Sequence, residues 1–220
     1  MQVPSNALSF KRLLLRWFRH AGRRLPWRAT RDPYRVLVSE FMLQQTQVSR
    51  VAQYYPRFLQ RYPTVHDLAN AGPKSVREAW DGLGYYRRAE NLHRLAQAVV
   101  KRHAGRVPDQ PEVLRTLPGV GPYTAAAVAT FAYEKRAAPV DTNVARVLGR
   151  VFRPRLADGA RGRRALAALA EAVLPRRPKA AWEFNQALMD LGATVCRARK
   201  PECPRCPVRG ACRTGRGARD

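Results

Sequence analysis

The stretch that decides the fold is residues 117–146, LPGVGPYTAAAVATFAYEKRAAPVDTNVAR. Gly119 and Gly121 flank Val120 in a tight turn that follows Leu117. Glycines let a backbone turn approach another surface closely, and the start of a helix exposes amide groups that favour an anion. The turn is therefore suited to grip a phosphodiester, although the same pattern is common in plain connectors between two helices.

A run of small apolar residues follows this turn. It begins at Thr124 and has no helix breaker before Pro139, which predicts a buried helix. Asp141 then precedes a second predicted helix over residues 142–150, whose first amide groups its short carboxylate can cap. Spacing alone favours this capping role for Asp141 over a catalytic one.

Positive charge dominates the composition. The 220 residues include 41 Lys and Arg against 16 Asp and Glu, for a formal net charge of +25. Because this surplus is spread along the whole chain, we expect a polyanionic partner, and nucleic acid fits best. No segment approaches the roughly 20 apolar residues that span a bilayer, and no secretion signal is present. We therefore expect a cytoplasmic protein. A genome of high GC content, which favours arginine codons, can explain part of the charge.

The apolar residues of most segments recur three and four positions apart, and no segment alternates with period two. This pattern predicts an all-α fold with little or no sheet. Among the expected helices are one around residues 10–18, one over residues 36–51 that carries Glu40 near its start, and one over residues 182–195. Residues 153–164 are polar and read as a linker or the start of a helix.

The four cysteines lie close together near the C-terminus, spaced C-x6-C-x2-C-x5-C, as Cys196, Cys203, Cys206 and Cys212. Few apolar residues surround them, so we expect a bound centre to supply the folding energy of this loop. Disulfides are disfavoured in a reducing compartment. Spacing alone leaves tetrahedral zinc and a [4Fe-4S] cluster equally possible.

Several stretches together resemble the HhH-GPD superfamily of DNA glycosylases, and within it the MutY-type adenine DNA glycosylases. They are LPWR at 25–28, SEFMLQQT at 39–46, GLGYY at 82–86, LPGVG at 117–121, VDTN at 140–143, FNQALMDLGA at 184–193 and the cysteine loop. The resemblance covers about residues 10–215. It implies a two-lobed helix-hairpin-helix fold, with one lobe over residues 30–138 and the other formed by 1–29 and 139–220. It also implies a [4Fe-4S] cluster on the four cysteines, and double-stranded DNA in a basic cleft between the lobes.

The resemblance also assigns the chemistry. Hydrolysis of an N-glycosidic bond needs an acid for the departing base and an anion for the oxocarbenium-like sugar. Glu40, which alone would read as an ordinary helix glutamate, is implied as the acid. Asp141 is implied as the stabilising anion, with Asn143 and Tyr123 completing the polar wall. Endonuclease III carries a lysine where this chain has Tyr123, and a phenol cannot form a Schiff base, so we expect a monofunctional glycosylase.

The resemblance assigns three sets of residues to DNA. Gln45 and Tyr85 are implied as wedges that fill the gap left by a flipped base, with Gln44 and Thr46 beside them. The adenine pocket would be lined by Leu25, Trp27, Arg28 and Gln186, although a tryptophan is more often a core residue. The phosphate-gripping turn comprises Leu117, Gly119, Val120 and Gly121.

Two alternatives stay open. MutY-type enzymes usually carry a second, C-terminal domain that recognises 8-oxoguanine, and this chain stops just after the cysteine loop. Dependence on 8-oxoguanine therefore stays open, and the expected target is adenine opposite either 8-oxoguanine or G. Glycosylases that remove thymine or uracil from G·T and G·U mismatches share the hairpin, the cluster and the tyrosine, but tend to carry arginine near Gln44 and Gln45. A non-catalytic DNA-damage-binding protein is a further class. We expect a monomer in each case.

Overall fold

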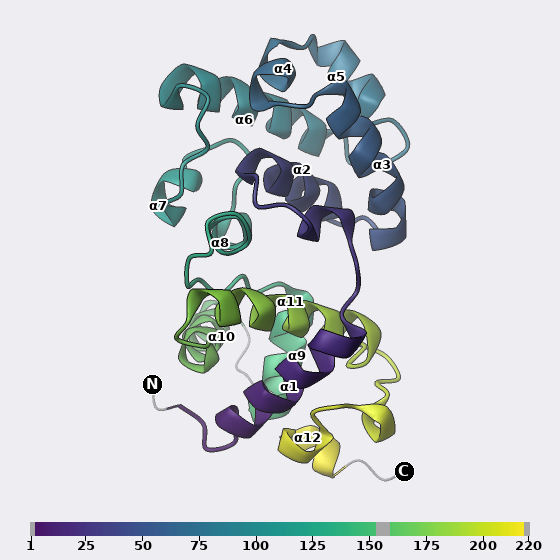
Figure 1. Ribbon diagram of the computed structural model, residues 1–220, viewed down its shortest axis with the longest axis vertical. Helices are drawn as coiled ribbons and strands as arrows, with labels where there is room; N and C mark the ends of the chain where they lie inside the picture. The colour runs from purple at the N-terminus through teal and green to yellow at the C-terminus, as the bar shows by residue number, and fades with distance from the viewer. Residues whose placement is uncertain (1–2, 153–158, 218–220) are drawn as a thin grey trace. The chain divides into compact units, whose positions relative to one another are not determined.

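The computed structural model describes residues 3–152 and 159–217, and every regular element in these ranges is a helix (Figure 1). The prediction of an all-α fold is confirmed. The chain divides into two compact units, which we call the central unit (Arg24–Tyr133) and the terminal unit (Met1–Arg23 with Glu134–Asp220). The lobe boundaries expected at residues 30 and 138 stay a prediction.

The central unit is a layered set of helices around one apolar core. Its elements are η1 (Pro26–Arg28), α2 (Pro33–Leu43), α3 (Val48–Arg61), α4 (Val65–Asn70), α5 (Pro73–Ala79), α6 (Arg87–His103), α7 (Pro111–Leu114) and α8 (Pro122–Phe131). Trp80 and Phe58 are fully buried and pack edge to face, with ring centroids 5.7 Å apart. Helix α2 packs against α3, α6 and α8, so the element that carries Glu40 forms the centre of this unit.

The hairpin predicted from the sequence is formed by α7, the turn over residues 115–121, and α8. Gly119 has a φ of 75°, and a Cβ at this position would lie 2.8 Å from Cβ of Asn91 and 2.9 Å from a ring carbon of Phe41. Glycine is therefore required here both by the backbone conformation and by the close approach of α2 and α6. The apolar run after the turn is helical, as predicted, but the helix ends at Phe131.

The continuous helix expected over residues 36–51 is wrong. Helix α2 ends at Leu43, residues 44–47 form a turn, and α3 begins at Val48. Gln45 in this turn has a φ of 56°, in the left-handed region that ends many helices. No glycine or proline marks the break, which is why apolar spacing carried the prediction through it.

The terminal unit joins both ends of the chain. Its elements are α1 (Ala7–Ala21), α9 (Thr142–Phe152), α10 (Gly159–Val173), α11 (Pro178–Thr194), η2 (Cys203–Arg205), η3 (Arg209–Ala211) and α12 (Arg213–Arg216). Phe10 lies edge to face with Phe152 at 5.2 Å and with Phe184 at 6.0 Å between centroids, so α1 is bound to α9 and α11 through aromatic packing. The expected linker at residues 153–164 falls partly outside the described residues, and its remainder belongs to α10.

A buried ion pair fixes the end of the N-terminal segment to α11. Asp190 is fully buried, and its carboxylate accepts hydrogen bonds from the Arg23 amide at 2.9 Å and from Arg23 Nε at 2.7 Å. Arg23 Nη2 lies 2.6 Å from the same carboxylate. Loss of the arginine would leave a buried charge without its counterion, which is strongly destabilising.

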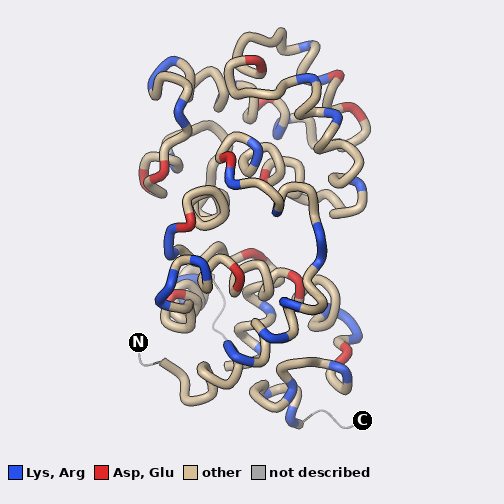
Figure 2. Tube along the Cα trace, in the orientation of Figure 1, with Lys and Arg blue, Asp and Glu red and all other residues tan. Residues whose placement is uncertain are grey.

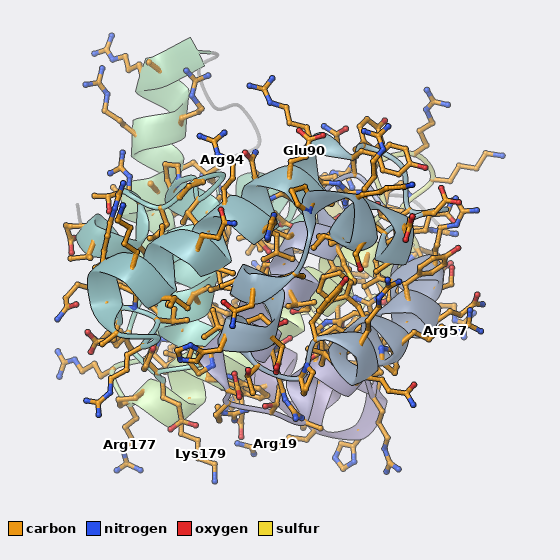
Figure 3. The ribbon with its side chains drawn as sticks, turned by 90° about the horizontal axis from the view of Figure 1, so that it is seen from above. Arg19, Arg57, Glu90, Arg94, Arg177 and Lys179 are labelled. Atoms are coloured by element: carbon orange, nitrogen blue, oxygen red, sulfur yellow. The ribbon has the colours of Figure 1, made fainter. Side chains whose placement is uncertain are left out.

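Arginine and lysine are distributed over both units (Figure 2). At the start of α11, Arg177 and Lys179 are exposed and their side chains reach away from the ribbon (Figure 3). Among the described residues, no helix is both long enough and apolar enough to cross a bilayer.

Candidate functional site

Glu40 lies inside the central unit. Helix α2 starts at Pro33, with Asp32 as its cap accepting from the Arg35 amide at 3.0 Å, and this start directs Glu40 toward the interior. Only 5% of Glu40 is exposed. An ordinary surface glutamate is thus excluded, since carboxylates are rarely buried without a specific reason.

Asp141 caps the first turn of α9 in the terminal unit. One carboxylate oxygen accepts from the Val144 amide at 2.7 Å, and the other accepts from Nδ2 of Asn143 at 3.1 Å. The predicted helix cap is therefore present. A carboxylate can accept about four hydrogen bonds, so capping leaves this group able to face a further cation.

A chain of hydrogen bonds connects Asp141 to the cysteine loop within the terminal unit. Asn143 bonds to Asp141, and Oδ1 of Asn143 accepts from Arg146 Nη2 at 2.7 Å. Arg146 Nε donates to the carbonyl of Cys196 at 2.8 Å. The approach is close because Gly192 lies beside Asn143, where an added Cβ would be 2.6 Å from the asparagine Cβ. Sequence reasoning missed Arg146 and quoted Gly192 only as part of a motif.

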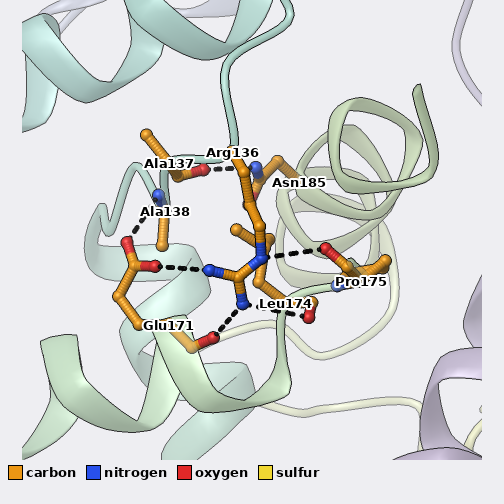
Figure 4. Close-up of polar contacts among 7 residues, drawn as sticks. All are labelled: Arg136, Ala137, Ala138, Glu171, Leu174, Pro175 and Asn185. Atoms are coloured by element: carbon orange, nitrogen blue, oxygen red, sulfur yellow. Dashed lines mark hydrogen bonds and ion pairs between the residues drawn. The ribbon is translucent and has the colours of Figure 1, made fainter. Parts of the chain in front are cut away.

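The segment that leads into Asp141 is tied to α10 and α11 (Figure 4). Arg136 donates to the carbonyls of Glu171 at 2.8 Å and Pro175 at 3.1 Å, at the C-terminal end of α10. Asn185 on α11 donates to the carbonyl of Ala137 at 2.9 Å. These bonds fix the backbone shortly before the aspartate.

The hairpin turn offers backbone rather than side chains. Leu117 and Val120 are 3% and 8% exposed, so their side chains belong to the core of the central unit. Gly121 is the N-cap of α8 and provides no side-chain cap. A phosphate would therefore meet backbone amides here. Tyr123 follows in the first turn of α8 and is half-buried.

The two predicted wedges are both exposed and both left-handed. Gln45 has a φ of 56°, and Tyr85 has a φ of 48° with 62% of its surface exposed. Their loops line one open hollow of about 890 Å³, to which Thr46 also contributes. Gln44 is the C-cap of α2 and is partly buried. The structure thus brings Gln45, Thr46 and Tyr85 to one hollow in the central unit.

The predicted base-pocket residues are divided between the units. Leu25, Trp27 and Arg28 lie at η1 in the central unit, where Trp27 is buried edge to face with Tyr55 at 5.7 Å between centroids. Gln186 is 5% exposed on α11 of the terminal unit. Trp27 therefore has the core packing expected of a tryptophan, and Gln186 is not a helix-surface amide.

The four cysteines are unbridged thiols that line one cavity of about 160 Å³ in the terminal unit. Burial, together with the neighbouring thiols, raises the pKa of Cys206 to about 11. Within the described part of the chain, no three or more His, Cys, Asp or Glu side chains gather closely enough to hold a single metal ion. The four sulfurs therefore border a single cavity, and a metal centre bound there would supply the positive charge that thiolates need.

The cysteine loop is less isolated from the core than its sequence indicated. Val208 and Ala211 are each 1% exposed and belong to the apolar core of the terminal unit. Arg150 Nη1 donates to Sγ of Cys196 at 3.4 Å and to the carbonyl of Arg197 at 2.7 Å. Apolar burial therefore anchors the end of the loop, and hydrogen bonds from Arg150 hold its start.

A family model and a curated relative place the chain in the same family. A model described as HhH-GPD superfamily base excision DNA repair protein matches residues 38–172. The adenine DNA glycosylase of Mycobacterium tuberculosis (strain ATCC 25618 / H37Rv) is 48% identical over 196 residues, covering 89% of this chain and 64% of that protein. The chain thus spans about two thirds of the length of this curated relative.

Two solved structures share the fold over nearly their full length. A thermostable thymine-DNA glycosylase matches with a TM-score of 0.87 and 33% identity, covering 97% of this chain and 98% of that chain. A trapped endonuclease III-DNA covalent intermediate matches with a TM-score of 0.81 and 26% identity, covering 98% of each chain.

Proposed function

The chain belongs to the HhH-GPD superfamily of base excision DNA repair proteins, and from this premise we propose that it is a DNA N-glycosylase that releases mismatched adenine. The observation that carries the proposal is the 48% identity to an adenine DNA glycosylase over 89% of this chain. The acidic residues that such a reaction needs, Glu40 and Asp141, are both present. The proposed target is adenine opposite 8-oxoguanine or G.

The proposed mechanism divides the work between two carboxyl groups. Glu40 donates a proton to the departing adenine, and its position inside the central unit, with 5% of the residue exposed, distinguishes it from a surface glutamate. Asp141 stabilises the positive charge that develops on the sugar, and Asn143 holds its carboxylate in place through the 3.1 Å hydrogen bond. Both groups must act on the same extruded nucleoside.

Water, rather than an amine of the protein, completes the reaction in this proposal. Tyr123 stands in the first turn of α8 and offers a phenol, which cannot form a Schiff base with the sugar. The product would be an abasic site in an intact strand. Borohydride trapping of a covalent protein-DNA adduct at a rate comparable with base release would contradict this proposal.

We further propose that Cys196, Cys203, Cys206 and Cys212 hold a [4Fe-4S] cluster. The C-x6-C-x2-C-x5-C spacing, which resembles the cluster loop of the family, and the single cavity that the four thiols line support this assignment. When bound, the cluster would bind the loop together and contribute to folding. The expected partner is double-stranded DNA of the nucleoid, bound by a monomer.

A second candidate is release of thymine or uracil from mismatches with G. It is favoured by one observation, the match to a thermostable thymine-DNA glycosylase over 98% of that chain. Gln44 and Gln45, which resemble the adenine enzymes, argue for the first candidate. A non-catalytic damage-binding protein would have no use for a buried acid at position 40.

The test is base release by the purified protein from four duplexes that carry A·8-oxoguanine, A·G, T·G and U·G pairs. We expect free adenine from the first two and no pyrimidine from the others. Release of thymine or uracil alone would establish the second candidate. Tight binding without release from any duplex would leave only the binding-protein interpretation.

A further inference from the structure

Arg88 is a buried arginine that forms hydrogen bonds both to the end of α2 and to the 82–86 loop. It lies in the first turn of α6, and 7% of it is exposed. Its guanidinium donates to backbone carbonyls on either side. The acceptors are Phe41 (3.0 Å), Met42 (2.7 Å) and Gln44 at the end of α2, and Leu83 (3.2 Å) and Gly84 (3.0 Å) in the 82–86 loop.

The first set of acceptors lies at the end of α2, where the last carbonyls of a helix have no partners within the helix. A glycine in the left-handed conformation usually resolves such an end, but here Gln45 takes that conformation with a φ of 56°. Arg88 satisfies the carbonyls and brings a positive charge to the negative end of the helix dipole. It thereby fixes the backbone from which Gln45 projects.

The second set of acceptors lies in the 82–86 loop, which carries Tyr85. Gly82 and Gly84 have φ values of 86° and 69°, and Tyr85 itself has a φ of 48°. The indole of Trp80 donates to the carbonyl of Gly84 at 3.2 Å. The Arg88 guanidinium lies 5.4 Å from the Trp80 ring centroid and 5.5 Å from that of Tyr85. The ring of the exposed Tyr85 therefore packs against the same buried guanidinium that bonds to the carbonyls at the end of α2.

A planar group with several fixed donors suits this geometry. A guanidinium offers five N–H groups in one plane and can stack on aromatic rings, whereas a lysine ammonium offers three donors on a flexible stem. The two loops line one hollow of about 890 Å³, and the exposed Gln45 and Tyr85 both border it. The distance between Gln45 and Tyr85 therefore depends on the contacts that join their two segments.

We propose that Arg88 is a positioning residue that joins the 44–47 turn to the 82–86 loop, so that Gln45 and Tyr85 enter a duplex as one rigid wedge. The inference rests on the proposed function, because it takes these two residues as the groups that replace a flipped nucleotide. Arg88 does not itself contact DNA in this scheme. Its contribution appears in base extrusion rather than in phosphate binding.

The experiment compares Arg88→Lys with Arg87→Lys, the same change at the adjacent exposed arginine. Each variant retains its positive charge. Base extrusion is measured from the fluorescence of 2-aminopurine placed next to the mismatched adenine in an A·G duplex, at saturating protein, and base release is measured in single turnover. Circular dichroism and visible absorbance check the fold and the bound cluster.

We expect R88K to reduce the fluorescence rise and to slow base release by about 10-fold to 100-fold, in line with the effect of a displacement near 1 Å. R87K should behave as the wild type, and duplex affinity should change little in either variant. If R88K fails to fold, Arg88→Gln, which keeps a planar donor group, is measured in the same way.

A double-mutant cycle with Tyr85→Ala separates positioning from general support of the fold. If Arg88 acts through the wedge, R88K should cause a smaller loss in the Tyr85→Ala background than in the wild type, because only its effect through Gln45 remains. Full additivity, or an unchanged fluorescence rise in R88K, would overturn the inference. A wild type that extrudes the base but releases nothing would refute the proposed function alone, while a wild type that does not disturb 2-aminopurine would refute the wedge and this inference together.

Discussion

The two units stabilise their irregular segments in different ways. In the central unit, the 44–47 turn and the 82–86 loop are joined by Arg88, a residue of the chain itself. In the terminal unit, the four cysteines line a cavity of about 160 Å³, where we propose that a cluster from outside the chain binds. The first arrangement is complete once the polypeptide folds, whereas the second would depend on the proposed cofactor.

The largest expected effect comes from emptying the cysteine cavity. Removal of iron, or Cys203→Ser, should expose residues 196–212 to proteolysis while residues 24–133 remain protected, because binding free energies on the order of 10 kcal/mol act as folding energy in structural metal sites. Limited proteolysis with mass spectrometry would measure both segments. Equal protection in the metal-free protein would remove the contrast between the units.

Next in size are the changes to the two carboxyl groups, one in each unit. Glu40→Gln should lower single-turnover base release by roughly 10²-fold to 10⁴-fold, the usual contribution of a general acid. Asp141→Asn should also abolish most activity, yet keep the α9 cap, because asparagine caps helices as well as aspartate does. Thermal unfolding serves as the control. Retained activity in either variant would contradict the assigned roles.

Close approach of glycine can be tested in both units. Gly119→Ala in the central unit and Gly192→Ala in the terminal unit should each destabilise the protein by about 1–3 kcal/mol, because the new Cβ meets atoms under 3.0 Å away. Gly121→Ala is the matched control for stability, since no atom lies within 4 Å of its added Cβ. Denaturant unfolding of the three variants would decide, and a large loss in the control would show that the turn is constrained for another reason.

The smallest effect is expected at Arg136. Its side chain bonds to carbonyls at the end of α10, as that of Arg88 does at the end of α2. Its side chain is 39% exposed, so its hydrogen bonds compete with water and its ion pair with Glu171 is screened. Arg136→Ala should lower the free energy of unfolding by about 1 kcal/mol, measured by urea denaturation. A loss several times larger would mean that burial does not explain the difference between these two arginines.

The sequence by itself determined the helical class, the family and the residues of the motifs. Apolar residues predicted helices where α1, α8 and α11 lie, and the glycines of LPGVG marked a turn whose φ of 75° at Gly119 only glycine adopts easily. Cysteine spacing marked a binding loop but not its occupant. These features depend on residues near one another in the chain, so a local reading of the sequence is sufficient.

Tertiary structure alone decided which carbonyls needed a partner and which side chain could reach them. The helix break after Leu43 and the role of Arg88 depend on contacts between residues more than 40 positions apart. One signal was present, since Arg88 shares the spacing of the apolar residues Leu92 and Leu95 on α6, where a charged residue is unexpected. Its meaning required the folded chain, because a buried cation is explained only by the acceptors that surround it.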